Sequence, residues 1–254
     1  MYIPLFGKAL VSAKGIILSD KKAEEIWSTQ NIGVKGRAAS KWLAYYMAMR
    51  AAVFDEWVAG LCNNFADCVV LHLGCGLDSR VLRLGSITQP WYDIDLPAVI
   101  CERHRYYAET HRYNMVSADL TNTDFIRELP PAERAIVVME GVSMYLTNTQ
   151  LTGLLSALEQ KYKCLSVLMD CYTPFAAKMS KIKNPINTMG KINVYGVASP
   201  EKIVQGTQVR FAAEHKLTPD HLVRQLQGNE RRLFKALYAG RTASKLYKLY
   251  EYQR

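Results

Sequence analysis

The sequence lacks the features that mark membrane-spanning, fibrous and disordered chains. None of its apolar runs free of charge approaches about 18 residues, the length that a membrane-spanning helix needs. It has no internal repeat and no low-complexity segment. Lys8 and Lys14 interrupt the apolar runs before Asp20, so no signal peptide is expected. We therefore expect a globular cytoplasmic protein without a membrane partner.

The cysteines also lack the spacing of a functional site. None of the six forms a Cys-x-x-Cys pair, and their spacing does not match a zinc site with nearby histidines. They are interpreted as reduced, mostly buried thiols of a cytosolic protein. No metal ion is expected.

Acidic residues are too few to balance the basic ones. The 254 residues include 32 Lys+Arg and 23 Asp+Glu, which gives a net charge of +9. Such a balance raises nucleic acid as a candidate partner. The segment 224–254 has eight basic and two acidic residues, or +6, so the other 223 residues carry only +3. This segment is either a solvated face or a patch that attracts an anion, such as an acidic acceptor or a carrier protein.

Apolar periodicity predicts helices near the N-terminus and then an alternation of strands and helices. Asp20 is a plausible N-cap for a helix over 21–29, and a second helix is expected over about 38–61. Strands are expected at 68–73, 91–94, 114–118, 135–139 and 164–169, with helices between them at 79–84, 96–112, 123–128 and 148–161. This alternation predicts an α/β fold, a mostly parallel sheet with helices on both faces and ligands at the carboxyl ends of its strands.

Proline and glycine break this alternation after residue 170. We expect a single domain with a helical cap at 1–62, a ligand-binding core at 63–170, a lid or acceptor-pocket insertion at 171–200 and a C-terminal completion at 201–254. In the last part, a strand is expected at 208–213 and helices at 222–226 and 231–238. The pattern of 244–252 is compatible with a strand or a helix.

The turn Gly74-Cys75-Gly76 joins the first strand to a helix, as a nucleotide-binding turn does. Ser79 replaces the third glycine of the GxGxxG pattern. Asp78 stands at the helix start, where its carboxylate would repel a pyrophosphate, although it is also explained as a plain N-cap. Both interpretations argue against NAD and favour a ligand without phosphate, such as S-adenosylmethionine (SAM).

Acidic residues follow the next three strands. Asp95 lies 19 residues after Gly76, a spacing that suits a bond to ribose hydroxyls. Asp93 is the other candidate, and we expect one of the two to contact the ligand and the other to be structural. Asp119 either accepts a bond from an adenine amino group or serves only in a turn. Glu140 directly follows an apolar strand and is expected at the ligand edge, partly buried.

Arg50 lies in the long helix among apolar residues. Its guanidinium suits a carboxylate such as the methionyl end of SAM. The alternative is a surface arginine whose stem passes apolar neighbours.

The segments LHLGCGLDSR, WYDIDLPAVI, SADL and MEGVSMYL, with the helix MAMRAAVFDEWV before them, resemble the leucine carboxyl methyltransferase family. The resemblance includes the bacterial tetracenomycin-type polyketide O-methyltransferases and spans roughly residues 5–170. It implies a class I SAM methyltransferase fold, a Rossmann-like seven-stranded sheet whose last strand is antiparallel. The segment 244–252 is then the candidate final strand.

The resemblance also implies roles for individual residues around SAM. It gives Arg50 the SAM carboxylate, Gly74 and Gly76 the methionyl chain, Asp95 the ribose, Asp119 and Leu120 the adenine, Glu140 a place in the cofactor site and Lys8, by a looser match, closure over the cofactor. Cys75 stands where many relatives carry alanine.

The sequence shows no clear general base. A carboxylate acceptor is already ionised at neutral pH and needs none, whereas a phenol or alcohol gains from one. No histidine stands at the end of a predicted strand after Gly76, and His72 is interpreted as a core residue. Glu140 and Tyr145 are the nearest polar candidates for catalysis. Tyr172, Met189 and Tyr195 either line the acceptor pocket or pack as ordinary aromatic and apolar residues.

The sequence therefore predicts a SAM-dependent O-methyltransferase that acts on a carboxylate or hydroxyl oxygen of a small molecule. Polyketide-like and other secondary metabolites, acidic or carrier-bound, are the expected acceptors. A protein C-terminal carboxyl methyltransferase is the alternative, because it would share every cofactor residue. Nucleic acid is not expected, since the motifs of adenine and cytosine methyltransferases are absent where the chain reads MEGV. A non-catalytic SAM-binding protein is disfavoured by the intact cofactor residues.

Overall fold

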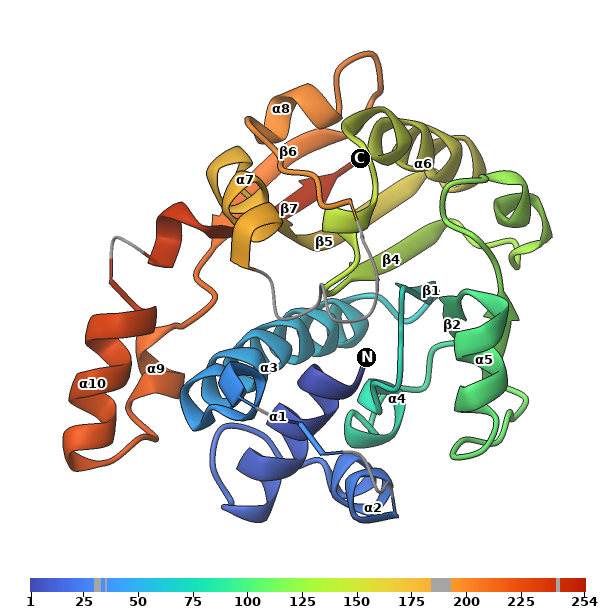
Figure 1. Cartoon of the computed structure of the whole chain (residues 1–254). Helices are drawn as coiled ribbons and strands as arrows, with labels where there is room; N and C mark the ends of the chain where they lie inside the picture. Colours follow the sequence, from blue (N-terminus) through green and yellow to red (C-terminus); the bar gives the residue numbers. More distant parts are fainter. Residues whose placement is uncertain (30–32, 35, 184–192, 241–242) are drawn as a thin grey trace. The chain divides into compact units, whose positions relative to one another are not determined.

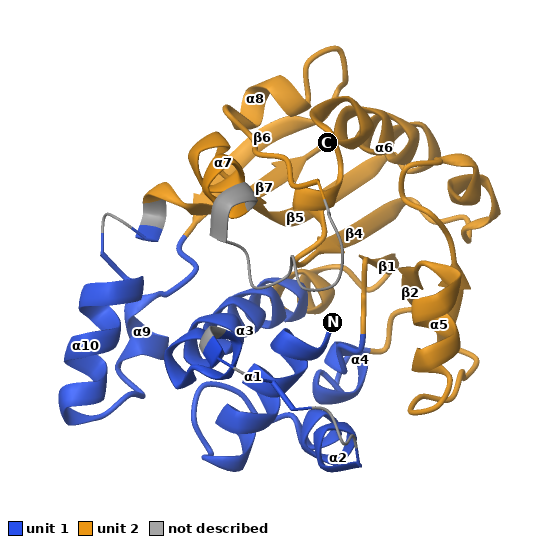
Figure 2. Ribbon diagram, in the orientation of Figure 1, with its two compact units in different colours: residues 1–59, 77–87, 216–244 blue, residues 60–76, 88–215, 245–254 orange. Residues whose placement is uncertain are grey.

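The structure is a computed structural model that describes residues 1–29, 33–34, 36–183, 193–240 and 243–254 (Figure 1). The chain forms two compact units, each built from separate stretches of sequence (Figure 2). Unit 1 contains 1–59, 77–87 and 216–244, and unit 2 contains 60–76, 88–215 and 245–254.

Unit 2 is built on a seven-stranded sheet in the order β3-β2-β1-β4-β5-β7-β6. Its strands are β1 (Cys68–Leu73), β2 (Trp91–Asp95), β3 (Tyr113–Ser117), β4 (Arg134–Met139), β5 (Cys164–Tyr172), β6 (Arg210–His215) and β7 (Tyr247–Gln253). The pairs among β1 to β5 are parallel, and β7 is antiparallel to both β5 and β6. The strand order reverses between β1 and β4, where ligands bind in open α/β sheets. The predicted fold class and the antiparallel last strand are confirmed.

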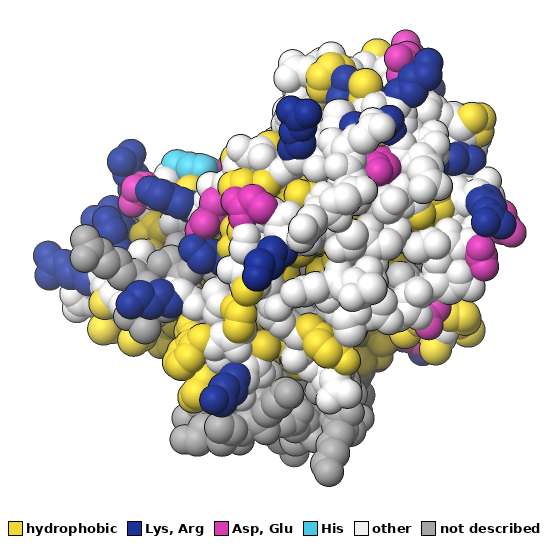
Figure 3. Space-filling view, turned by 90° about the horizontal axis from the view of Figure 1, so that it is seen from above, with side chains coloured by type: hydrophobic (Ala, Val, Ile, Leu, Met, Phe, Trp, Pro, Cys, Tyr) yellow, Lys and Arg dark blue, Asp and Glu magenta, His cyan; other side chains and the backbone are white. Residues whose placement is uncertain are grey.

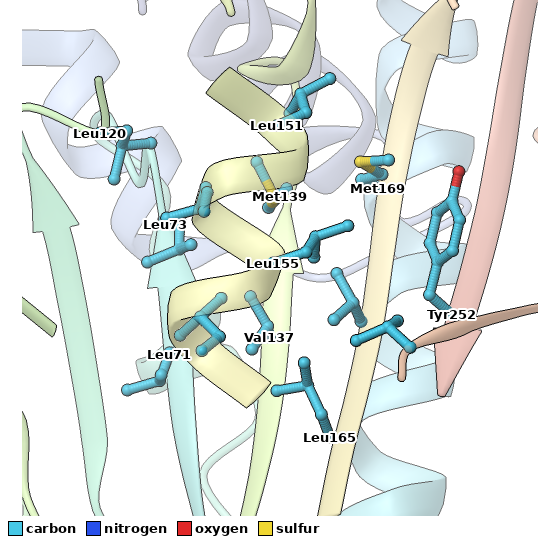
Figure 4. Packing of buried hydrophobic residues seen from close by; sticks show 14 of the residues in the cluster. Leu71, Leu73, Leu120, Val137, Met139, Leu151, Leu155, Leu165, Met169 and Tyr252 are labelled. Atoms are coloured by element: carbon cyan, nitrogen blue, oxygen red, sulfur yellow. The ribbon is translucent and has the colours of Figure 1, made fainter. Parts of the chain in front are cut away.

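A buried apolar layer joins the central strands to α6 (Asn148–Lys161). Leu71 and Leu73 of β1 and Val137 and Met139 of β4 are buried, at the two-residue spacing that puts side chains on one face of a strand. Figure 4 shows these side chains beside Leu151 and Leu155 of α6, the predicted helix at 148–161. The hydroxyl of Thr147 accepts from the Gln150 N–H, and the Gln150 side chain accepts from the Thr147 N–H. This capping box fixes the start of α6.

The remaining helices of unit 2 are short. They are α5 (Pro97–Arg103), η2 (Asp124–Glu128), η3 (Ser143–Tyr145), α7 (Pro174–Lys183) and α8 (Pro200–Ile203). The helix expected over 96–112 was too long, because α5 ends at Arg103. After α5, the Thr110 hydroxyl and the Glu109 carboxylate accept backbone N–H bonds from Tyr113 and Met115, so this segment forms a turn that leads into β3.

Unit 1 is helical. Its elements are α1 (Tyr2–Ala13), α2 (Lys21–Thr29), η1 (Gly36–Ala39), α3 (Lys41–Asn64, up to residue 59), α4 (Arg80–Arg83), α9 (Asp220–Val223) and α10 (Gly228–Tyr238). The Asp20 carboxylate accepts the Ala23 N–H at 2.8 Å, which confirms the predicted cap of α2. A Cβ at Gly7 of α1 would lie 3.2 Å from backbone atoms of Ala44 in α3, so α1 and α3 approach each other closely there.

The segment expected to be an insertion at 171–200 is partly helical. Tyr172 ends β5, and α7 follows it. Residues 184–192, and with them Met189, lie outside the described residues. The helices in the described ranges include none that is long and apolar enough to cross a membrane.

Candidate active site

The turn after β1 meets the turn after β4 at the switch point of the unit 2 sheet. Gly74 has φ +71°, and its N–H donates to the Ile94 carbonyl at 2.7 Å. A Cβ at Gly74 would lie 2.6 Å from Cβ of Val142. Position 74 therefore requires a residue that adopts a positive φ and has no Cβ, and glycine meets both requirements.

The backbone N–H and the carbonyl of Gly76 both form hydrogen bonds with side chains. Its N–H donates to Oδ2 of Asp95 at 2.7 Å, and its carbonyl accepts from Nη1 of Arg103 at 2.9 Å. Oδ1 of Asp95 accepts the Leu96 N–H at 2.8 Å. Asp95 is partly exposed at the end of β2, and an ionised carboxylate has about four acceptor positions, so hydroxyl donors from a ligand can still bind it.

Asp93, two residues earlier, is fully buried and surrounded by donors. Oδ1 lies 3.1 Å from Nδ1 of His72 and 2.9 Å from Nε1 of Trp91. Oδ2 accepts from the Tyr113 hydroxyl at 2.8 Å and forms an ion pair with Arg103. Of the two aspartates left open by the sequence, Asp93 has the structural role, and His72 is the core residue that was predicted.

The charge of Asp93 is kept despite its burial. Removal from water alone would raise the pKa of this carboxyl. The positive charge of Arg103 and the bonds from His72 and Trp91 outweigh this effect, and the pKa is lowered below its usual value. The ionised Asp93 therefore fixes Arg103, which in turn holds the Gly76 carbonyl. Arg103 was not predicted from the sequence as a site residue. The available signal was an arginine in the helix that follows β2, close to the strand ends.

Asp119 and Leu120 follow β3. Oδ1 of Asp119 accepts the Thr121 N–H at 2.9 Å, so this exposed residue does serve in a turn. Within the described part of the chain, its Oδ2 makes no hydrogen bond. Leu120 is 7% exposed and belongs to the core cluster. The contact of Asp119 with adenine stays a prediction.

The end of β4 is anchored to β5 and β7. Glu140 is 9% exposed, as its position after an apolar strand predicted. Gly141 has φ +74°, and its N–H donates to Oδ1 of Asp170 at 2.7 Å. Oδ2 of the buried Asp170 accepts from the Tyr247 hydroxyl at 2.7 Å. Neither Asp170 nor Tyr247 was predicted from the sequence, although an acid within the apolar run SVLMDCY was a signal.

Large apolar side chains are exposed beside the same strand ends. Tyr145 of η3 is 39% exposed and Tyr195 is 37% exposed, and the Tyr195 N–H donates to the Met144 carbonyl at 2.8 Å. On α7, Phe175 is 59% and Met179 is 44% exposed. Tyr172 instead packs edge-on against Tyr247, with ring centroids 5.0 Å apart, in agreement with the packing alternative.

In unit 1, the residues predicted to bind the cofactor are buried. Lys8 is 3% exposed, and its Nζ lies 3.1 Å from Oδ2 of Asp78. Arg50 is also 3% exposed, so the surface-arginine alternative is wrong. Asp78 is not the N-cap of α4, because Ser79 takes that position and Asp78 accepts the Arg80 N–H at 3.1 Å.

A network of ion pairs surrounds Asp78 in unit 1. Asp55 binds Nε of Arg80 and Nε of Arg83, each at 2.6 Å. Arg83 also pairs with Asp78 and, at 3.2 Å, with Asp20. Burial would lower the pKa of the Arg83 guanidinium, but the charges of Asp55 and Asp78 raise it well above its usual value. The carboxylates of this network thus stabilise the positive charge of Arg83.

The polar side chains at the strand ends of unit 2 favour a cationic ligand with hydroxyl and amino donors. Asp95 ends β2, while Asp119 and Glu140 follow β3 and β4, and carboxylates repel a pyrophosphate while they accept hydroxyl and amino hydrogens. Gly74 and Gly76 add no side chains to the turn after β1, and Cys75 between them is buried. SAM, which has a sulfonium, a ribose and an adenine but no phosphate, fits these residues.

Comparison with known proteins supports the same assignment. The family model described as leucine carboxyl methyltransferase matches residues 5–159. The chain belongs to this family. The match includes the turn after β1 and the strand ends that hold Asp95, Asp119 and Glu140.

Two curated relatives agree with membership in the leucine carboxyl methyltransferase family. The tetracenomycin polyketide synthesis O-methyltransferase TcmP of Streptomyces glaucescens is 31% identical over 189 residues, which cover 74% of this chain and 70% of the relative. The SAM-dependent methyltransferase dpfgK of Gibberella zeae is 27% identical over 140 residues, or 50% of this chain and 46% of that protein. The present protein is therefore a SAM-dependent methyltransferase, and its cofactor is SAM.

Solved structures show the same fold at low identity. The putative methyltransferase of Thermobifida fusca YX has a TM-score of 0.61 at 12% identity, covering 87% of this chain and 89% of that one. Magnesium protoporphyrin IX methyltransferase of Synechocystis PCC 6803 with bound SAH has a TM-score of 0.54 at 13% identity, covering 92% and 93%. The class I methyltransferase fold of this family member is therefore confirmed.

Proposed function

We propose that this methyltransferase transfers the methyl group of SAM to a carboxylate or hydroxyl oxygen of a small aromatic acceptor. The exposed apolar side chains beside β4 and β5 carry this proposal. Exposed groups of large apolar residues mark binding surfaces, and here they lie at the sheet edge where ligands of this fold class bind. The polyketide synthesis O-methyltransferase among the relatives supports an oxygen acceptor.

The proposed cofactor site follows the carboxyl ends of β1 to β4. The roles are ribose binding by Asp95, adenine binding by Asp119 and Leu120, close approach of the methionyl chain to Gly74 and Gly76, and a further cofactor contact by Glu140. When bound, SAM supplies an electrophilic methyl group. The contacts of Lys8 and Arg50 with the cofactor stay predictions.

The proposed acceptor face is formed by Tyr145, Phe175, Met179 and Tyr195. Its aromatic rings offer flat apolar contacts, and such contacts favour an acceptor with a planar ring system. The Tyr195–Met144 hydrogen bond joins the segment before α8 to η3, so Tyr145 and Tyr195 belong to neighbouring backbone segments. Holding the acceptor oxygen near the methyl carbon and excluding water are the tasks assigned to this face.

The acceptor decides how much acid–base chemistry is required. A carboxylate with an ordinary pKa of about 4 arrives ionised, so positioning suffices. A phenol needs a proton acceptor, for which Glu140 and Tyr145 are the proposed groups. Glu140 is buried at the end of β4, and Tyr145 lies five residues later in the exposed group.

The test is a methyl-transfer assay with radiolabelled SAM and four acceptors: 1-naphthoic acid, 1-naphthol, octanoic acid and a peptide with a free C-terminal carboxylate. We expect transfer to a naphthalene acceptor in preference to octanoic acid. Phe175→Ala should raise KM for that acceptor at unchanged affinity for S-adenosylhomocysteine (SAH). Leu237→Ala, which alters a leucine of similar exposure on α10, is the control. Transfer only to the C-terminal carboxylate of a peptide would contradict a small acceptor, and preference for octanoic acid would contradict an aromatic one.

A further inference from the structure

A hollow lies between α9 and α10 in unit 1. Its volume is about 420 Å³, within the range of sites for small molecules. It is lined by Asp220, Val223, Arg224, Arg231, Arg232 and Lys235. Figure 3 shows Lys and Arg side chains at many places on the face of the molecule that it draws. Four of the six lining residues are basic and one is acidic.

The three arginines of this hollow differ from its lysine in their ionic partners. Lys235 lies 3.6 Å from Asp220, but in the part of the chain that the structure describes, the side chains of Arg224, Arg231 and Arg232 form no ion pair. Other arginines of unit 1 differ in this respect, since Arg80 and Arg83 each bind carboxylates. The basic C-terminal segment is thus divided, because Lys248 pairs with Glu214 and Arg254 binds backbone carbonyls in unit 2.

The arrangement of these charges is unfavourable without an anion. Arg231 and Lys235 are four residues apart on α10, a spacing at which like charges repel each other. Arg232 and Arg224 add two more positive charges at the same hollow. A bound dianion would turn this repulsion into attraction. The lining side chains carry a net charge of +3, from four cations and Asp220.

Guanidinium chemistry selects the class of anion. Arginine presents a planar fork of donors that matches two oxygens of a phosphate at once. A phosphate monoester or diphosphate carries enough charge and oxygens for several arginines. The hollow is larger than a phosphate group, so it has room for the molecule that carries the phosphate, and Val223 provides an apolar contact there.

We propose that the hollow between α9 and α10 is a binding site for the phosphate group of a small phosphorylated molecule. Arg224, Arg231 and Arg232 bind the phosphate oxygens. Lys235 adds charge while Asp220 orients it. This site is separate in sequence and in unit from the cofactor residues at the strand ends of unit 2, so it does not depend on the proposed acceptor.

The test is isothermal titration calorimetry of the full chain with pyrophosphate at about 0.15 M NaCl, where surface charges are largely screened. We expect saturable binding with a Kd below about 1 mM. The triple variant Arg224→Gln, Arg231→Gln and Arg232→Gln should weaken binding at least tenfold and leave SAH affinity within twofold. The three substituted arginines are exposed, so the triple variant should keep its fold, and circular dichroism checks this.

A matched triple variant controls for net charge. Lys163→Gln, Arg210→Gln and Lys216→Gln remove three exposed positive charges elsewhere that form no ion pair among the described residues, and pyrophosphate affinity should stay within twofold. Absence of saturable binding, or an equal loss in both triple variants, would overturn the proposal. Equal affinity for citrate would overturn the choice of phosphate. Tighter binding of a short RNA that is lost in the first triple variant would replace the small molecule by a nucleic acid.

Discussion

The carboxylates of unit 1 and those at the strand ends of unit 2 differ in their partners. In unit 1, Asp55 and Asp78 are buried and bound to arginine and lysine side chains. In unit 2, Asp95 is partly exposed, and both of its oxygens accept backbone N–H groups. A buried carboxylate matched by cations contributes to the fold, whereas one oriented by backbone donors at an open edge keeps acceptor positions for a ligand.

The same difference appears within β2. Asp93 and Asp95 share one face of the strand, because side chains repeat every two residues. Asp93 is paired in register with His72 of β1 and is covered by neighbours, while Asp95 lies beyond the last paired residue of β1. Two residues of displacement along a strand thus separate a structural carboxylate from a candidate ligand contact.

The largest expected effect comes from breaking the unit 1 network. Asp55→Ala removes the carboxylate that binds Nε of both Arg80 and Arg83, and removal of one partner of a buried pair costs about 3–5 kcal/mol. Urea unfolding followed by tryptophan fluorescence measures this loss, since Trp27, Trp42 and Trp57 lie in unit 1. The control is Asp124→Ala, which breaks an exposed pair and should change little. A loss below about 1 kcal/mol for Asp55→Ala would contradict the structural role.

Gly74→Ala tests the closeness of the two turns at the switch point. The new Cβ would meet Val142 at 2.6 Å and the residue would keep φ +71°, so we expect a loss of about 1–3 kcal/mol in unfolding free energy and weaker SAH binding. Gly153→Ala in α6 is a control of opposite sign. It meets no atom within 4 Å and should stabilise the helix by about 0.5–1 kcal/mol. A Gly74→Ala protein as stable as the wild type would refute the close approach.

Asp95→Ala tests the open carboxylate directly. We expect SAH affinity, measured by calorimetry, to fall at least tenfold, which is about 1.4 kcal/mol. The reason is the loss of both the proposed ribose contact and the acceptor that holds the Gly76 N–H. Asp124→Ala again serves as the control. If Asp95→Ala binds SAH as tightly as the wild type, Asp95 is not a cofactor residue.

The smallest expected effect concerns the pH dependence of Asp93. Its pKa is lowered in the folded protein, so its ionised form contributes to stability at every pH above the unfolded value of about 3.9. This contribution is lost as the pH falls below that value and through the folded pKa. Carbon-13 NMR of labelled aspartates should show a carboxyl that titrates below the ordinary value of about 3.9, and this signal should be absent in Asp93→Asn. Titration at or above the ordinary value would contradict the Arg103 ion pair.

Local signals were enough to predict several elements from the sequence. The strand at 68–73 and the helix at 148–161 were predicted with the bounds that the structure shows, because an apolar run and a capping box define them locally. The helix α1 was not predicted as an element, and the helix after β2 was predicted to end nine residues too late, at 112 instead of Arg103. Its end depends on turn hydrogen bonds rather than on apolar spacing.

Site residues that follow strands could be predicted from the sequence. Contacts between residues far apart in the sequence could not. Glycine and acidic residues after β1 to β4 could be placed at one edge from the alternation alone. The choice between Asp93 and Asp95 required the strand register. The bonds of Asp170 to Gly141 and to Tyr247 join residues 29 and 77 positions apart, and no local pattern encodes them.

The division of the chain into two units limits how the protein can be recombined with its relatives. The backbone passes between the units at 59–60, 76–77, 87–88, 215–216 and 244–245. The segment that joins β6 to β7, two paired strands of unit 2, itself belongs to unit 1. A chimera that exchanges one unit with a related enzyme therefore needs five junctions, and neither unit can be transplanted as a continuous cassette.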